Sequence, residues 1–296
     1  MKLVTFFTEG QETLGVKLEQ GILSLADIAR ISNSVDLAST RIDEFIRDDL
    51  TKRVQGLIEQ YQSELSSHLI SDENVQYAPC VPRPGKIICI GLNYRQHAIE
   101  TNAPIPTIPI VFSKFSDTVA AHHEQIPLPR KSTQVDYEAE LGVVIGRRTV
   151  DVSKENALDH VFGYCNVNDL SARDLQMRTH QWLLGKTCEK FAPAGPYLVT
   201  ADEVRNPNDL EIKAFVNGEK RQDSNTSDMI FHVDEIVSYL SQYMVLEPGD
   251  LILTGTPQGV ILGYPEDQRV WLKAGDSVTI EIEKLGSLTN TFYDSI

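Results

Sequence analysis

One stretch of the chain, Val135-Asp-Tyr-Glu-Ala-Glu-Leu-Gly-Val-Val-Ile145, holds two glutamates, Glu138 and Glu140, directly before an apolar run. In a β-strand, side chains two apart share one face, so both carboxylates, together with Asp136, would point into the same space. Such a row loses solvation and repels itself, which raises the pKa values of the acids unless a cation such as a divalent metal compensates. A solvent-exposed sheet face is the competing interpretation, because charged alternation is common in antiparallel sheets.

The composition is that of a globular protein with room for one large domain and a small one. Of 296 residues, 41% are hydrophobic and 23% are charged, which allows a sizeable core. Acidic residues outnumber basic ones by 42 to 27, for a net charge of −15. Nucleic acid and anionic membranes would be repelled at long range, so neither is expected as the main partner.

Cysteine spacing and the N-terminal sequence indicate a protein of a reducing compartment. Cys80, Cys89, Cys165 and Cys188 are far apart and form no C-x-x-C motif, so neither a zinc knuckle nor a disulfide framework is expected. The apolar run near the N-terminus stops at Thr8, which is too early for a signal peptide or a membrane span. We therefore expect a cytoplasmic location.

Residues 1–75 are predicted to form a small N-terminal α/β domain. Strand character is found in three short segments, residues 3–7, 14–18 and 22–25. Apolar positions then recur at helical spacing between Ile42 and Leu65. Residues 71–84 are polar and contain prolines, as in a connection between domains. The rest of the chain, residues 76–296, is expected to be the main domain.

The main domain is predicted to be a largely antiparallel β core with helices on its flank. Strands are expected at residues 86–91, 110–114, 161–169, 212–216, 219–221, 251–254 and 278–282. Asn217-Gly218 is typical of a type I′ hairpin turn. Helices are expected at residues 171–181, with Ser171 as the N-cap, and at residues 233–244. Residues 92–102 can hold only a short helix or a loop, because prolines follow soon afterwards.

Asp169 ends the strand predicted at residues 161–169, on the face of that strand rather than in a turn. It could therefore converge with Glu138 and Glu140. Ligand sets made only of oxygen suit a hard cation such as Mg²⁺ or Mn²⁺, whereas Zn²⁺ more often recruits histidine or cysteine. The three carboxylates are thus a candidate metal site.

His97 and Glu100 are three residues apart in the short polar segment. One helical turn would bring them together, so that the carboxylate orients the imidazole and raises its basicity. This is the arrangement of a general base. The alternative is a surface histidine beside a glutamate on a solvated helix.

Five short stretches of the sequence, taken together and in this order, carry a resemblance to a known family. They are Gly91-Leu-Asn-Tyr-Arg-Gln-His-Ala-Ile-Glu100, Tyr137-Glu-Ala-Glu-Leu-Gly-Val-Val-Ile145, Asn168-Asp-Leu-Ser-Ala-Arg-Asp174, Lys186 with residues 191–196, and Leu253-Thr-Gly-Thr-Pro-Gln-Gly-Val260. From Pro84 onward the chain thereby resembles the fumarylacetoacetate hydrolase family, in its branch of acylpyruvate hydrolases and related 2-oxo acid enzymes. The resemblance implies a mainly β (α+β) fold, a mixed β-sandwich roll with flanking helices, usually assembled as a homodimer. It also implies that Mg²⁺ or Mn²⁺ is held by Glu138, Glu140 and Asp169.

The resemblance assigns roles to further residues. His97 and Glu100 match a catalytic dyad on a segment that closes over the site, and Lys186 matches an active-site lysine. Four residues match positions near the substrate, namely Tyr94, Arg173, Gln176 and Thr256. Thr256 lies in a turn whose main chain is similar to the family's cradle for the substrate carboxylate. Tyr94 could equally pack beneath the closing segment.

The implied function is that of a metal-dependent hydrolase that cleaves a carbon-carbon bond in a 2,4-dioxo acid, of the acylpyruvate or fumarylpyruvate type, to pyruvate and a carboxylic acid. The same metal-enolate chemistry would serve oxaloacetate decarboxylation or isomerisation of a 2-hydroxy-dienoate, so these outcomes stay open. A metal-binding scaffold without turnover is a further alternative. Lys186 is followed by Thr-Cys-Glu189, where many relatives carry a small residue, an aromatic and an aspartate, which leaves the identity of the small-molecule 2-oxo acid open.

Overall fold

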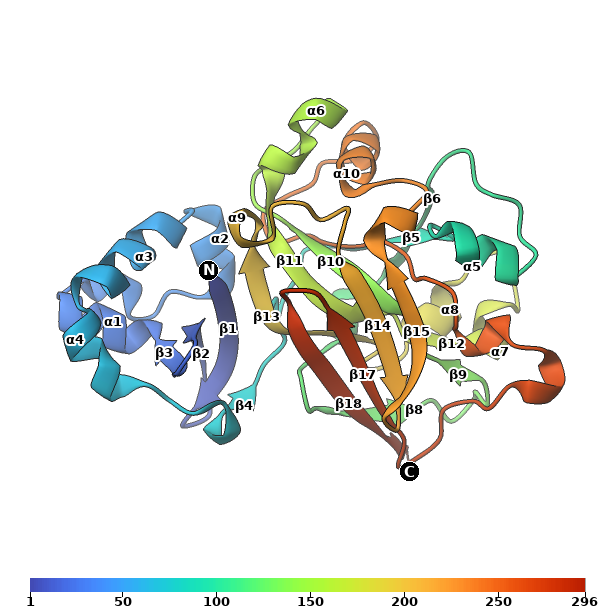
Figure 1. Ribbon diagram of the computed structural model, residues 1–296, viewed down its shortest axis with the longest axis horizontal. Coiled ribbons are helices and arrows are strands. Elements are labelled where there is room, and N and C mark those ends of the chain that lie inside the picture. Colours follow the sequence, from blue (N-terminus) through green and yellow to red (C-terminus); the bar gives the residue numbers. More distant parts are fainter. Residues whose placement is uncertain (296) are drawn as a thin grey trace.

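A large mixed sheet dominates the fold in the computed structural model, which describes residues 1–295. Its strands in chain order are β1 (Lys2–Thr8), β2 (Gln11–Leu18), β3 (Gly21–Ser24), β4 (Gln76–Tyr77), β5 (Ile87–Gly91), β6 (Ile110–Lys114), β7 (Val119–Ala120), β10 (Ala139–Ile145), β11 (Val161–Asn168), β13 (Ala192–Thr200) and β16 (Leu251–Leu253). They are arranged across the sheet as β3-β2-β1-β13-β11-β10-β16-β5-β6, with β4 beside β1 and β7 beside β13 (Figure 1).

A second sheet of five strands packs against the first. Its strands are β8 (Gln125–Leu128), β14 (Glu211–Val216), β15 (Glu219–Asn225), β17 (Ser277–Ile282) and β18 (Gly286–Asp294), in the order β15-β14-β17-β18-β8. Strands β14 and β17 lie against β10 and β11 (Figure 1). The core there includes Leu141, Val143 and Ile145 of β10. A separate ribbon pairs β9 (Val135–Asp136) with β12 (Ser171–Ala172).

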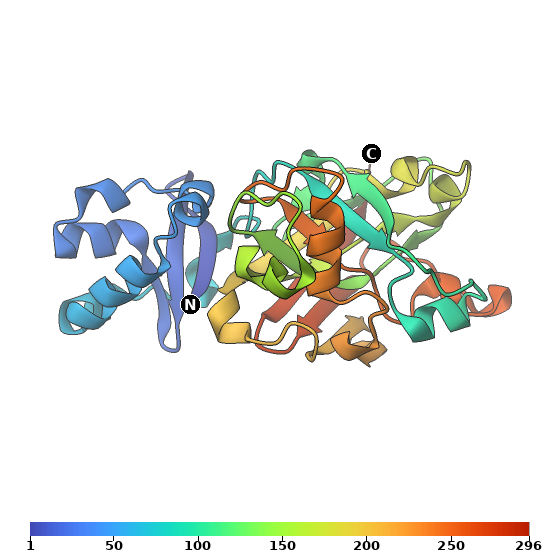
Figure 2. The same cartoon turned by 90° about the horizontal axis from the view of Figure 1, so that it is seen from above.

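Helices flank both sheets (Figures 1 and 2). They are α1 (Leu25–Ser32), α2 (Ile42–Arg47), α3 (Thr51–Gln60), α4 (Gln62–Leu65), α5 (Arg95–Glu100), α6 (Lys154–Ala157), α7 (Arg173–Gln176), α8 (Leu183–Lys186), α9 (Ala201–Val204) and α10 (Val233–Ser241). Most neighbouring strands are antiparallel, but β16 with β5, β13 with β7, and β18 with β8 are parallel. The predicted mainly β fold with flanking helices is confirmed. Across residues 1–295, every helix is too short or too polar to cross a bilayer.

The N-terminal segment extends the large sheet, because β1 pairs antiparallel with both β2 and β13. Helices α1 to α4 cover this end of the sheet (Figure 2). The periodic stretch between Ile42 and Leu65 is broken into three helices, since Asp49 takes a left-handed φ of 46° and Leu50 N donates back to Phe45 O. The division into residues 1–75 and 76–296 stays a prediction.

Two local predictions in the main domain are wrong, whereas the hairpin is confirmed. Residues 171–181 are not one helix: the ribbon captures Ser171, whose hydroxyl donates to Asp169 O instead of capping, and only α7 is helical. No strand was expected after residues 278–282, yet β18 follows β17 and pairs with it. Asn217 and Gly218, with φ values of 52° and 81°, form the expected turn between β14 and β15.

Candidate active site

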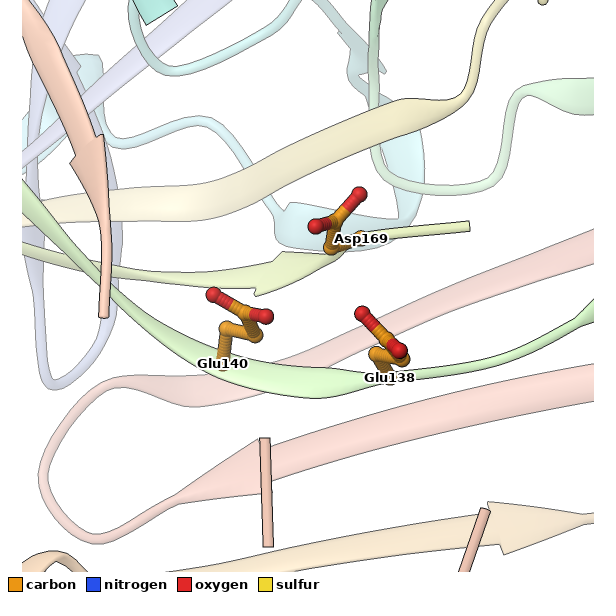
Figure 3. Close-up of side chains that lie close together, drawn as sticks. All are labelled: Glu138, Glu140 and Asp169. Carbon is orange, nitrogen blue, oxygen red and sulfur yellow. The ribbon is translucent and has the colours of Figure 1, made fainter. Parts of the chain in front are cut away.

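Pairing of β10 with β11 brings the three predicted carboxylates together. Asp169 follows β11 and its N–H donates to the main-chain oxygen of Glu138 at 2.9 Å. One carboxylate oxygen from each of Glu138, Glu140 and Asp169 lies within 4.8 Å of the other two, and the three carboxyl groups turn toward a common space (Figure 3). All three side chains are buried, so an exposed sheet face is excluded.

Three buried cations surround these acids. The ammonium of Lys186 donates to Glu138 Oε2 at 2.7 Å and to Asp169 Oδ2 at 2.8 Å. The guanidinium of Arg173 donates to Glu138 Oε1 at 2.7 Å and to Asp136 at 2.9 Å. Asp136 ends β9 and Glu138 lies just before β10, so the two are not on one continuous strand, yet one guanidinium contacts both acids.

Lys114 completes the set, and sequence reasoning missed it. Its ammonium donates to Asp169 Oδ1 at 2.5 Å and to Leu170 O at 3.0 Å. Lys114 ends β6 on the same face as Phe112, which lines the cavity. No local pattern in the sequence marked this contact, because it depends on the order of the strands in the sheet. Four buried carboxylates, counting Asp136, therefore face three buried cations, which leaves one negative charge in excess.

The excess charge falls on Glu140. Burial alone would raise the pKa of Glu138, but Lys186 and Arg173 lower it to about 2. Burial, Asp169 and Glu138 raise the pKa of Glu140 well above its usual value. Within residues 1–295, Glu140 has no cation partner; Gly255 N donates to its Oε2 at 2.7 Å. A hard divalent cation beside Glu140, Glu138 and Asp169 would meet three oxygen ligands and give Glu140 the positive partner that it lacks, so the donor set fits such an ion.

Lys186 is charged in this setting. Its burial lowers the pKa, yet the adjacent Asp169 and Glu138 carboxylates raise it above the ordinary lysine value. An ammonium has three N–H donors, of which the carboxylates use two. The nitrogen also lies 5.0 Å from the centre of the Phe112 ring. The neighbouring carboxylates thus favour the ammonium form, which can donate a hydrogen bond to a substrate oxygen.

The histidine and glutamate predicted to form a dyad are in contact. His97 Nδ1 lies 2.8 Å from Glu100 Oε1, both on α5. The Glu100 carboxylate also accepts from Gly259 N at 3.0 Å, which ties α5 to the turn after β16. His97 is only 6% exposed, so the surface interpretation of this pair is wrong. With Nδ1 held by Glu100, the Nε2 atom is the one left for a reacting group.

A cavity of about 620 Å³ lies above the acids. Eight of the predicted site residues line it, namely His97, Glu100, Glu138, Glu140, Arg173, Gln176, Lys186 and Thr256. Thr256 is held by Gln222, whose Nε2 donates to its hydroxyl oxygen at 2.9 Å. Tyr94 does not line the cavity; it is fully buried and packs in the core beneath α5. The roles of these residues stay predictions.

The support that Asp136 gives to the cavity wall was not predicted. Asp136 is fully buried and accepts from Ile261 N at 2.8 Å and Leu262 N at 3.0 Å. It thereby holds the wall segment, residues 261–271, against Arg173. This segment contributes Leu262, Gly263, Tyr264, Pro265 and Arg269 to the cavity, and no periodic pattern in the sequence marked it.

Comparisons with known proteins agree on a family. Residues 86–293 match the model described as fumarylacetoacetate (FAA) hydrolase C-terminal. The chain is 39% identical over 296 residues to a mitochondrial oxaloacetate tautomerase of Xenopus laevis, covering 98% of this chain and 89% of the relative. It is 44% identical over 235 residues to a 2,4-didehydro-3-deoxy-L-rhamnonate hydrolase of a Sphingomonas strain, covering 79% and 82%. A maleylpyruvate hydrolase of Sphingobium, solved with manganese(II) and pyruvate, superposes over the whole of both chains with a TM-score of 0.80 at 28% identity.

Proposed function

Because the chain belongs to the fumarylacetoacetate hydrolase family, we propose that it interconverts the keto and enol forms of oxaloacetate. One observation carries the proposal: a single acid-base pair, His97 and Glu100, lies at the same cavity as the three convergent carboxylates of Glu138, Glu140 and Asp169. These three acids, together with Asp136 and the buried cations Lys114, Arg173 and Lys186, are called the floor. Moving a proton between C3 and the C2 oxygen needs one base and stabilisation of negative charge on that oxygen. The tautomerase from Xenopus, 39% identical over 98% of this chain, supports the choice of reaction.

The residues divide the work as follows. His97 Nε2 takes the proton from C3 of the keto form and returns it to the C2 oxygen, while Glu100 fixes the imidazole through Nδ1. The third N–H of Lys186 donates to the C2 oxygen as charge develops there. Thr256 binds the adjacent carboxylate. In the reverse direction His97 removes the enol proton and delivers it to C3.

Glu138, Glu140 and Asp169 would hold Mg²⁺ or Mn²⁺, and the manganese in the Sphingobium structure favours Mn²⁺ as the first ion to test. When bound, the ion supplies Lewis acidity at the 2-oxo acid head of the substrate. Arg173 and Lys114 orient the carboxylates that they contact. Such supporting contacts affect metal affinity strongly in other proteins.

The test is to follow decay of the oxaloacetate enol by its ultraviolet absorbance. With Mn²⁺ present, the protein should speed the approach to equilibrium without changing the final keto-enol ratio, and excess chelator should remove the effect. Pyruvate release, coupled to lactate dehydrogenase, reports decarboxylation in the same samples. Absence of any acceleration by the Mn²⁺-loaded protein would rule tautomerisation out.

Hydrolysis of a 2,4-dioxo acid is the second candidate. A cavity of about 620 Å³ leaves space beyond a 2-oxo acid head for an acyl tail, and the Sphingomonas relative is named a hydrolase. In that reaction His97 would activate water for attack on the distal carbonyl. Release of pyruvate from acetylpyruvate or fumarylpyruvate, with no effect on the oxaloacetate enol, would favour this alternative.

A homodimer is also proposed. Apolar side chains are exposed along residues 105–115, which include the edge strand β6: Ile105 is 45%, Ile108 62% and Phe115 55% exposed. Exposed apolar groups beside an unpaired strand edge are typical of an interface between subunits. Light scattering coupled to gel filtration would measure the mass, and a monomer would contradict the proposal. The cytoplasmic location stays a prediction.

A further inference from the structure

Arg269 lines the cavity and has no charged partner. Its Nε donates to the main-chain oxygen of Tyr264 at 2.9 Å. Throughout residues 1–295, no carboxylate lies within ion-pair distance of it, and its two terminal amino groups have no protein acceptor. It is half-buried. A guanidinium fixed at Nε and open at both Nη atoms presents the fork that binds a carboxylate through two parallel hydrogen bonds.

An ordinary surface role explains this arginine poorly. Two exposed acids, Glu266 and Asp267, lie in the same wall segment, yet neither forms an ion pair with Arg269. A merely solubilising arginine would point outward beside these acids. Instead the carbonyl of Tyr264, another residue of the cavity wall, holds the side chain at the cavity.

The charge balance of the floor indicates which ligand group Arg269 could bind. With a divalent ion bound, the four buried carboxylates would face the ion and three buried cations, which leaves one positive charge in excess. The single carboxylate of a 2-oxo acid head neutralises that remaining charge. A second carboxylate on the substrate would then need a cation of its own, and Arg269 is the cavity-lining cation that contacts no floor residue.

We propose that Arg269 is a specificity-determining residue that binds the distal carboxylate of a dicarboxylic 2-oxo acid. This inference rests on the proposed function only in placing the 2-oxo acid head at Glu138, Glu140 and Asp169. The substrates would then be dicarboxylic acids, and the wall segment that carries Arg269 would select them. The acyl tail of a monocarboxylic substrate would leave the guanidinium unpaired.

Matched ligand pairs test the inference by binding affinity instead of by reaction rate. Oxaloacetate and 2-oxobutanoate, 2-oxoglutarate and 2-oxopentanoate, and 2-oxoadipate and 2-oxohexanoate each differ by a carboxylate in place of the terminal methyl group. Calorimetric binding to the Mn²⁺-loaded protein should favour the diacid by roughly tenfold to a hundredfold at one chain length at least. That length measures the reach from the head to Arg269.

Variants then locate the effect. Arg269→Gln should bring the diacid preference close to one, and Arg269→Lys should keep part of it, because lysine retains the charge but not the fork. Arg178→Gln is the matched control: Arg178 is exposed, lies outside the cavity and changes net charge equally. Thermal unfolding of Arg269→Gln should match the parent protein.

The outcomes separate this inference from the proposed function. A diacid preference near one at all three lengths, or one that survives in Arg269→Gln, overturns the role of Arg269 even if oxaloacetate is tautomerised. An equal loss in Arg178→Gln also overturns it, because the effect would then be a general one of charge. A preference that depends on Arg269, in a protein without tautomerase activity, supports the diacid site while the proposed reaction fails.

Discussion

On the floor of the cavity, both carboxylate oxygens of Glu138 and of Asp169 are bonded to buried cations, whereas Arg269 on the wall bonds only to a backbone carbonyl. The floor is buried and most of its charges are paired, so removing a member of an ion pair leaves its partner buried and uncompensated. Arg269 on the wall is half-buried, and its side chain makes one hydrogen bond to the protein. The comparison indicates that paired buried charges hold the catalytic and metal-binding groups of the floor in place. The wall segment can change, and with it the choice of substrate, at small cost in stability.

Removal of a floor ligand should have the largest effect. In Glu140→Gln, we expect Mn²⁺ affinity to fall at least about a hundredfold and turnover to drop to background, because the acid without a cation partner is the one that a metal compensates. The metal-free protein should keep its stability, since the amide oxygen can still accept from Gly255 N. Calorimetric Mn²⁺ titration measures the affinity, with the exposed Glu266→Gln as control. Undiminished Mn²⁺ binding would contradict the floor as the metal site.

Loss of the base comes next. His97→Ala should reduce turnover by about 10²- to 10⁴-fold, the usual contribution of a general base, while Mn²⁺ binding persists. Comparison with His180→Ala, an exposed histidine outside the cavity, isolates the effect of position. Initial rates on the oxaloacetate enol and on acetylpyruvate check it together. Equal rates in His97→Ala and the parent would remove His97 from the mechanism.

Replacing a floor cation should affect folding itself. Lys114→Met leaves Asp169 Oδ1 without its ion pair in a fully buried position, and breaking such a pair costs about 3–5 kcal/mol of unfolding free energy. Arg269→Gln on the wall should change that free energy by less than about 0.5 kcal/mol. Urea unfolding of the metal-free protein compares the two. Equal losses would erase the distinction between floor and wall.

The contact between the wall segment and α5 predicts a smaller effect. A Cβ atom on Gly263 would lie 2.6 Å from the Glu100 carboxyl carbon, so Gly263→Ala should displace Glu100 and weaken its hold on His97. We expect kcat to fall by roughly tenfold to a hundredfold, as small misplacements of catalytic groups cost, with Mn²⁺ affinity unchanged. Gly56→Ala, where a new Cβ meets nothing within 4 Å, is the control. An unchanged kcat would show that the closed position of Glu100 is not needed.

An effect that depends on pH concerns a buried histidine whose pKa is lowered by folding. Burial, with a contribution from His123, lowers the pKa of His122 from 6.5 to about 4. The unfolded chain therefore takes up a proton near pH 6.5 and the folded one only near pH 4, so this group costs stability as the pH falls between those values. His122→Asn should flatten that part of the curve, and His180→Asn should not. Urea unfolding at several pH values measures the slope; identical slopes in His122→Asn and the parent would exclude the assignment.

Sequence alternation was enough to find the acids of the floor but not their partners. Glu138 and Glu140 follow from the period of two, and Asp169 follows from its place after a strand. Lys114 and Asp169 are distant in sequence, and their contact depends on the order of strands in the sheet, which a local pattern does not encode. Ser171 had the chemistry of a helix cap, yet pairing with Asp136 in the ribbon prevailed. The wall segment has no regular element longer than a single 3-10 turn, so its side chains could not be placed in advance.

The pairing of β1 with β13 has a consequence for how the chain is made. Lys2 lies opposite Val199 and Leu3 opposite Leu198. During synthesis, this edge of β1 therefore stays unpaired until β13, nearly 200 residues later, has been made. Unpaired strand edges of this kind promote association between nascent chains. Contacts so distant in sequence also close slowly. The seam between β1 and β13 is therefore where we expect assembly of the sheet to finish, and where a slowed or crowded synthesis would first produce aggregates.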